Sequence, residues 1–206
     1  MKIIQFLPSF IWTADLKNQV WRQIKTVILL SVLMVSCSNE EIITQQIREM
    51  QSSPVRVHSE EMVYLCEDGI TSTLSHDKNT PFYLVIFSDS TGCSSCAVNR
   101  LSKWNEFLNF ERENKLGLIF ILNPAKVEYN DVVNAYSSSG IEHSVLIDTC
   151  GVFLEKNPQI PRNRTFHTFL MDSNGNVLLV GNPIGNQKIR DLMYKIINDK
   201  ASPKIY

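Results

Sequence analysis

Three apolar segments, separated by stretches with helical patterning, constrain the fold of this chain most strongly. They are FYLVIF at 82–87, LGLIFIL at 116–122 and HSVLID at 143–148. Continuous apolar runs of this length are typical of strands that are buried on both faces, as in parallel sheets. The intervening residues predict helices over 94–114 and 131–138. Because a helical crossover returns the chain in the same direction, the three strands should be parallel.

The later part of the chain adds antiparallel strands. FHTFLMD and NVLLVG flank Ser173 to Gly175, which is a β-hairpin signal. Short strands are expected within 55–76, a short helix at 152–156, and a terminal helix over 187–199. The fold class that follows is α/β, with a mixed central sheet and helices on both faces.

The first predicted helix, over 94–114, carries an apolar stripe. Val98, Leu101, Trp104 and Leu108 lie on this stripe, with Phe107 beside it. Such spacing is typical of an amphipathic helix that packs on a core. The Trp104 stripe is therefore interpreted as core rather than as a binding face.

A short apolar run ends at Cys37. Arg22 and Lys25 precede the run at 26–36, which is about half of the roughly 20 residues that a membrane-spanning helix needs. A basic flank and a short apolar core are typical of a secretory signal. The alternatives are an ordinary cleaved signal and a buried helix.

The residues around Cys37 resemble the signal of bacterial lipoproteins, in which the cysteine becomes the N-terminus and carries lipid. The resemblance implies a signal segment over 1–37 with Cys37 as the lipid attachment site. A polar tether over 38–54 and a domain over 55–206 would follow. The protein would lie in the periplasm or cell envelope, held by its lipid to the inner or outer membrane.

Cys93 and Cys96 are three residues apart at the start of the first predicted helix. This spacing brings two thiols close enough for a disulfide. A helix N-terminus lowers the pKa of a thiol, so Cys93 is expected to be the nucleophile and Cys96 the resolving thiol. The alternative is a structural disulfide. A zinc site needs about four ligands, and Cys66 and Cys150 lack the paired spacing, so no metal is expected.

These features together resemble the thioredoxin fold: a buried strand, the segment Gly92 to Cys96 opening a helix, and a hairpin with Thr168 to Asp172, Gly175 and Val177. DSTGCSSC, Trp104, FHTFLMD and VGNP more narrowly resemble the thioredoxin-like lipoproteins of Bacteroidota. The resemblance covers about 82–198. It implies a thiol–disulfide oxidoreductase that acts on protein thiols or disulfides and is served by an envelope redox donor.

Two positions depart from the thioredoxin pattern. Phe166 stands where the family has a substrate-contacting cis-proline, and a trans peptide bond is expected there. The buried acid on the strand before the cysteines is missing, and the nearest acid is Asp89, expected in the loop. The resemblance places Gly92, Phe166 and His167 at the substrate site. His167 is a candidate proton acceptor, or else a surface or hydrogen-bonded strand histidine.

Several classes of function are disfavoured. The net charge of −1 gives no basic excess for nucleic acid. There is no glycine-rich phosphate loop, so no organic cofactor is expected. The serine and threonine near Cys93 lack the proline of the peroxide-reducing pattern. The remaining rival to the enzyme is a non-catalytic thioredoxin-like module with a structural Cys93–Cys96 disulfide, whose role is binding a partner in the envelope.

Overall fold

The computed structural model describes residues 14–57, 59–66, 69–71, 80–89, 94–113, 115–140 and 143–201. The chain divides into two compact units, residues 1–45 and residues 46–206. Helix α1 (Ala14–Met50) includes the described residues of the first unit and the first residues of the second. None of the helices in the described part of the chain is long and apolar enough to cross a membrane.

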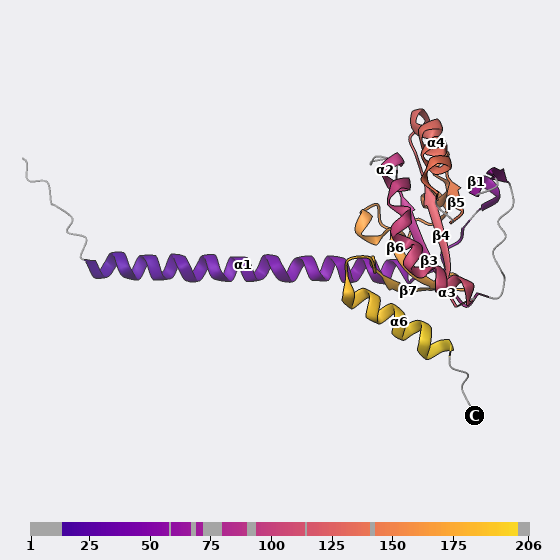
Figure 1. Cartoon of the computed structure of the whole chain (residues 1–206). Helices are drawn as coiled ribbons and strands as arrows, with labels where there is room; N and C mark the ends of the chain where they lie inside the picture. The colour runs from indigo at the N-terminus through magenta and orange to yellow at the C-terminus, as the bar shows by residue number, and fades with distance from the viewer. Residues whose placement is uncertain are drawn as a thin grey trace, which may run out of the picture. The chain divides into compact units, whose positions relative to one another are not determined.

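The described strands of the second unit form one seven-stranded sheet in the order β2-β1-β5-β4-β3-β6-β7 (Figure 1). The strands are β1 (Val63–Cys66), β2 (Gly69–Thr71), β3 (Phe82–Ser88), β4 (Gly117–Leu122), β5 (Val145–Ile147), β6 (Thr168–Asp172) and β7 (Val177–Val180).

The strand directions confirm the predicted mixed sheet. β3 is parallel to β4, and β4 is parallel to β5. β6 is antiparallel to β3, and β7 is antiparallel to β6, as expected for the hairpin. At the other side, β1 pairs antiparallel with both β5 and β2. The central order β4-β3-β6-β7, with a helical crossover between β3 and β4, makes the fold thioredoxin-like.

The predicted helix over 94–114 is wrong as a continuous α-helix. The structure has α2 (Ser94–Asn99), the 3₁₀ helix η2 (Leu101–Phe107) and α3 (Leu108–Arg112). A 3₁₀ helix has three residues per turn and so keeps side chains three apart on one face. Val98, Leu101, Trp104 and Phe107 are spaced by three and all are buried, whereas Leu108 is only half-buried. The 3₁₀ turn is therefore compatible with burial of all four side chains.

The other helices agree closely with the prediction. They are α4 (Tyr129–Ser139), α5 (Val152–Lys156) and α6 (Gln187–Ala201). Gly140 follows α4 with a φ of 62°, a conformation that favours glycine and ends the helix. Three short 3₁₀ turns complete the described helical elements: η1 (Ser59–Glu61), η3 (Lys126–Glu128) and η4 (Arg164–Phe166).

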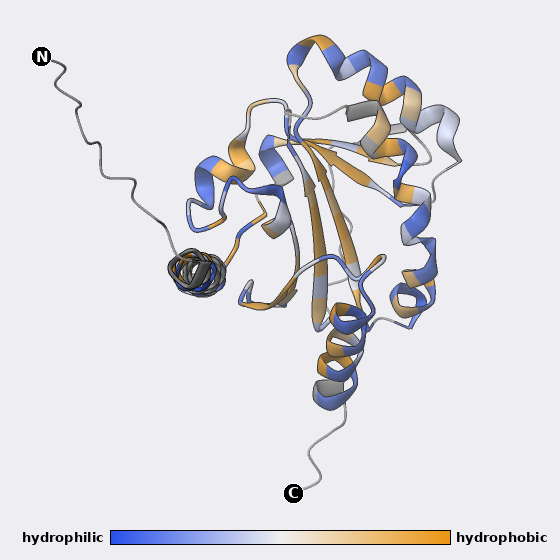
Figure 2. Ribbon diagram, turned by 90° about the vertical axis from the view of Figure 1, so that its left-hand side faces the viewer, coloured by the Kyte–Doolittle hydropathy of each residue, from blue (hydrophilic) through white to orange (hydrophobic). Residues whose placement is uncertain are grey.

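The sheet has a hydrophobic cluster on each face. Leu84 packs in one cluster with residues of α2, η2, α4 and α6, while Val85 packs in the other with residues of α5 and η4. Neighbouring residues of a strand point to opposite faces, so β3 serves both clusters. Figure 2 shows the central strands as hydrophobic, with helices that carry hydrophilic residues around them.

The first residues of the second unit contribute to its core. Met50 at the end of α1 is fully buried in the cluster on the α5 face. The backbone N–H of Val55 donates to the carbonyl oxygen of Gly175 at 2.8 Å. The compact unit therefore begins at Gln46, within the segment 38–54 that the sequence suggested as a tether.

Candidate functional site

Cys96 lies on α2, in the segment that follows the central strand β3. Its side chain is exposed, and its sulfur is disulfide-bonded. Cys93 and Gly92 lie outside the described residues. The half-buried Cys66 and the exposed Cys150 are both thiols, so they do not pair with each other.

The carboxyl ends of the three parallel strands meet at one edge of the sheet. The N–H of Asn123, after β4, donates to the carbonyl oxygen of Ser88 in β3 at 2.8 Å. The N–H of Asp148, after β5, donates to the carbonyl oxygen of Leu122 in β4 at 2.7 Å. Asp89 follows β3 directly and lies in the loop, as predicted. Cys150 therefore lies at the same edge as the segment that leads to Cys96, with β4 between their strands.

The residues before β6 are buried rather than exposed to a substrate. The peptide bond before Phe166 is trans, as expected. Phe166 and His167 are each 2 % exposed. The carbonyl oxygen of His167 accepts a hydrogen bond from the N–H of Phe87 at 2.9 Å, which holds this segment against β3. Burial of both residues leaves little of either accessible to a substrate.

His167 is a buried histidine with one hydrogen-bonded ring nitrogen. Its Nε2 lies 3.0 Å from the carbonyl oxygen of Pro161, so Nε2 carries the proton and donates. Its Nδ1 is buried and has no hydrogen-bond partner among the described residues. Burial lowers the pKa of His167, which keeps the imidazole neutral at physiological pH. The same burial disfavours protonation at Nδ1, so His167 is a weak base here, contrary to its expected role as proton acceptor.

Arg164 joins the loop after β3 to η4. Its Nη2 and Nε donate to Oδ1 of Asp89 at 2.6 and 2.9 Å. Hydrogen bonding to the Asp89 carboxylate is the main reason that the pKa of Arg164 is raised. The two residues are 75 positions apart. Sequence reasoning noticed Asp89 but missed Arg164, because no local pattern links the two.

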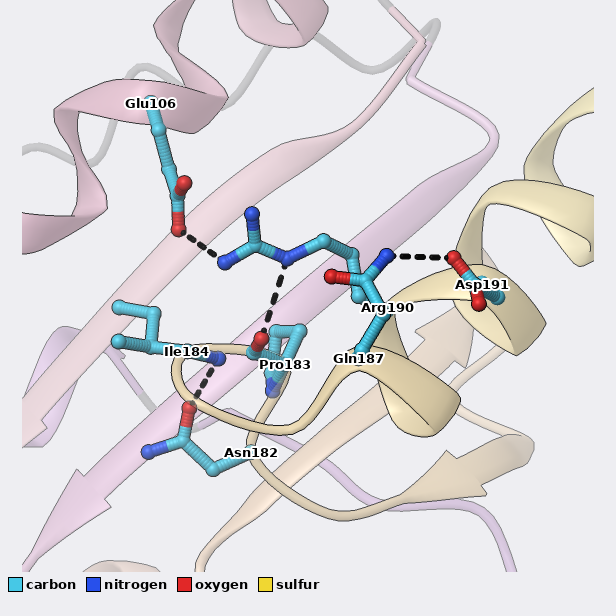
Figure 3. A network of polar contacts seen from close by, with 7 residues as sticks. All are labelled: Glu106, Asn182, Pro183, Ile184, Gln187, Arg190 and Asp191. Atoms are coloured by element: carbon cyan, nitrogen blue, oxygen red, sulfur yellow. Dashed lines mark hydrogen bonds and ion pairs between the residues drawn. The ribbon is translucent and has the colours of Figure 1, made fainter.

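A cleft of about 500 Å³ lies beside these residues. Its lining includes the end of β3, the η2 residues Leu101 and Trp104, Arg164, and the loop after β7. Figure 3 shows how that loop is held. Arg190 of α6 donates to the carbonyl oxygen of Pro183 at 3.2 Å and to Oε1 of Glu106 in η2 at 2.9 Å.

A second, apolar cavity of about 370 Å³ lies beside Cys150. Pro124, Tyr129 and Val63 contribute to its lining together with Cys150. Within the described part of the chain, no group of three or more His, Cys, Asp or Glu side chains is arranged to hold a metal ion.

No protein-family model matches the sequence, and no curated protein matches it. Solved structures similar to this chain include a thioredoxin-like protein of Porphyromonas gingivalis, at 15% identity over 68% of this chain and 88% of that one, with a TM-score of 0.44. The bacterioferritin comigratory protein of Xanthomonas campestris, which reduces alkyl peroxides, matches at 11% identity over 74% and 99%, with a TM-score of 0.47. A thioredoxin-like protein of Bacteroides caccae matches at 13% identity over 78% and 56%, with a TM-score of 0.43.

Proposed function

We propose that this chain is a thiol–disulfide oxidoreductase that exchanges disulfides with protein substrates through Cys93 and Cys96. The observation that carries the proposal is the exposed, disulfide-bonded Cys96 on α2, after the central strand of the sheet. Exposed disulfides are open to attack by a thiolate and tend to be the labile or catalytic ones.

Cys93 is the proposed partner of Cys96. Cys66 and Cys150 are thiols, so neither is the disulfide partner of Cys96. Cys93 precedes Cys96 by three residues, a spacing that suits a disulfide across the start of a helix. Cys37 has a different proposed role, as the lipid attachment site.

The proposed reaction consists of two exchange steps. The Cys93 thiolate attacks a substrate disulfide, forms a mixed disulfide and releases one substrate thiolate. The Cys96 thiolate then attacks the mixed disulfide, forms the Cys93–Cys96 bond and releases the second substrate thiolate. Two electrons pass from the protein dithiol to the substrate, and the reverse sequence oxidises a substrate dithiol.

The proposed location is the cell envelope, with lipid on Cys37 as the membrane anchor and an envelope redox protein as the electron partner. This part rests on the basic flank, the apolar run and the cysteine in the sequence. Labelling with radioactive palmitate should mark the wild-type chain and not the Cys37→Ala variant. Equal labelling of the two chains would contradict the anchor and leave the exchange activity to be judged separately.

A redox titration tests the exchange activity. The full chain in detergent, with Cys66→Ser and Cys150→Ser to remove the other thiols of the second unit, is equilibrated in dithiol buffers and trapped with an alkylating reagent. A reversible two-electron transition between about −120 and −270 mV, the range of known exchange proteins, is expected. A pair that stays oxidised below about −300 mV, as structural disulfides do, would contradict the enzyme.

That negative result would favour the second candidate function, a thioredoxin-like binding module with a structural disulfide. The observation in its favour is Phe166, a buried aromatic side chain where the thioredoxin pattern has a substrate-contacting proline.

A further inference from the structure

The cleft beside the end of β3 concentrates positive charge. Arg100, Lys103 and Arg164 line it, and no acidic side chain among the described residues does. The chain as a whole has a net charge of −1, so this concentration does not reflect a generally basic surface. A cleft lined by one sign of charge raises the local concentration of the opposite charge and speeds its association.

Two of the three cations are available to a ligand. Arg164 shares its charge with Asp89 through the hydrogen bonds at 2.6 and 2.9 Å. Arg100 and Lys103 are exposed, and within the described part of the chain neither forms an ion pair. The nearby carboxylate of Glu106 is engaged by Arg190 at 2.9 Å (Figure 3). The charges of Arg100 and Lys103 are therefore not neutralised by any acidic side chain of the described residues.

Apolar residues make up part of the remaining lining. Leu101, Trp104 and Ile184 all contribute to it. An occupant that satisfies both kinds of lining carries at least one carboxylate next to an apolar side chain. A short segment of polypeptide with acidic and apolar residues has this composition.

The cleft lies close to the disulfide along the chain. Arg100 follows Cys96 by four residues, directly after α2, and its backbone is helical with φ −88° and ψ −12°. Side chains four residues apart on a helix lie on one face, about one turn from each other. A segment bound beside Arg100 therefore lies about one helical turn from Cys96.

We propose that this cleft selects protein substrates in which acidic and apolar residues flank the reactive cysteine. The proposal rests on the proposed function and adds a substrate class to it. In the step concerned, the reduced Cys93–Cys96 pair converts one substrate disulfide to two thiols and becomes the disulfide. Arg100 and Lys103 bind the acidic flank and raise the rate at which the substrate reaches the thiolate.

Single-turnover exchange with the pre-reduced full-length protein tests the selection. The substrates are three disulfide-linked dimers of a single-cysteine peptide, identical except that the flanks carry two Glu, two Lys or two Gln. The variant is Arg100→Gln/Lys103→Gln, and the control is Lys188→Gln/Lys195→Gln, which removes the same charge from exposed lysines of α6. At low salt the acidic peptide should react about tenfold faster than the basic one. This preference should shrink to about twofold near 0.5 M salt. It should persist in the control and vanish in the cleft variant.

Each other outcome has a distinct meaning. Equal rates for the three peptides would overturn the inference and leave the exchange activity standing. Faster reduction of glutathione disulfide than of the acidic peptide, lost in the cleft variant, would make the occupant a small anionic thiol and overturn the protein-segment proposal. If none of the peptides reacts, the exchange activity fails. Fluorescence anisotropy with the Cys→Ser acidic peptide then tests the cleft alone, and binding no tighter than to the Lys-flanked peptide would overturn it.

Discussion

Asp148 holds the first turn of α5 through both oxygens of its carboxylate. Oδ1 accepts from the N–H of Val152 and Oδ2 from the N–H of Phe153, each at 2.9 Å. The residue is 0 % exposed, so water cannot replace these bonds. Because Thr149 and Cys150 lie between β5 and α5, this clamp also shapes the loop that carries the Cys150 thiol.

The variant Asp148→Asn keeps the size of the side chain and removes half of this clamp. The amide oxygen still accepts from one backbone N–H. The amide NH₂ faces the other N–H, so two donors then lie opposite each other without an acceptor. Hydrogen bonds to a charged group contribute about 1.5–3 kcal/mol, and a buried donor left without an acceptor costs about 1–3 kcal/mol. We expect the free energy of unfolding to fall by about 3 kcal/mol.

Urea denaturation of the oxidised protein, followed by circular dichroism, measures this loss. With a slope of about 2 kcal/mol per molar, the midpoint should fall by about 1.5 M at unchanged slope. The matched control is Asp131→Asn, an exposed acid in the first turn of α4, where only the helix dipole is involved and less than about 1 kcal/mol is expected. Equal losses in the two variants would refute the reasoning.

Three further predictions concern stability. Burial lowers the pKa of His167, so protons favour the unfolded chain as the pH falls below about 6.5, and stability should drop there by at most about 1.4 kcal/mol per pH unit from this residue. In thermal melting from pH 7.5 to 5.5, the melting temperature of His167→Gln should fall less steeply with decreasing pH than that of the wild type. An equal fall in the two proteins would contradict this account. Gly175→Ala should lower the free energy of unfolding, measured in urea, by more than about 2 kcal/mol, because φ is +86° and the added Cβ meets the carbonyl oxygen of Val55. The control Gly185→Ala, where φ is +79° and the added Cβ meets no neighbour, should lower it by about 1 kcal/mol. Phe107→Ala should cost about 3–5 kcal/mol and Phe107→Leu clearly less, since the ring is fully buried; similar costs for both would argue against a packed site.

The sequence pattern identified the strands of the core well. The predicted strands at 82–87 and 116–122 correspond to Phe82–Ser88 and Gly117–Leu122, and the predicted hairpin corresponds to β6 and β7. These features are readable because a strand buried on both faces must be apolar along its whole length, and a tight turn needs residues such as Gly175. The sequence also drew attention to Cys96, through its spacing from Cys93.

The sequence pattern was less informative where two local structures have similar free energies. An apolar spacing of three or four residues suits either an α-helix or a 3₁₀ helix, and contact with the sheet decided for η2 between Leu101 and Phe107. His167 was interpreted as a proton acceptor or as a surface or hydrogen-bonded strand residue. The structure buries it directly before β6, with Nε2 bonded to Pro161.

The sequence by itself thus determined the order and type of the core elements, because local apolar periodicity specifies which faces must be buried. Only the tertiary structure decided which distant residues meet. It paired Asp89 with Arg164, attached β1 to β5, and gathered Arg100, Lys103 and Arg164 around one cleft. Contacts between residues that are far apart in sequence depend on how the sheet orders its strands, and that order is set by the packing of the whole domain rather than by any local pattern.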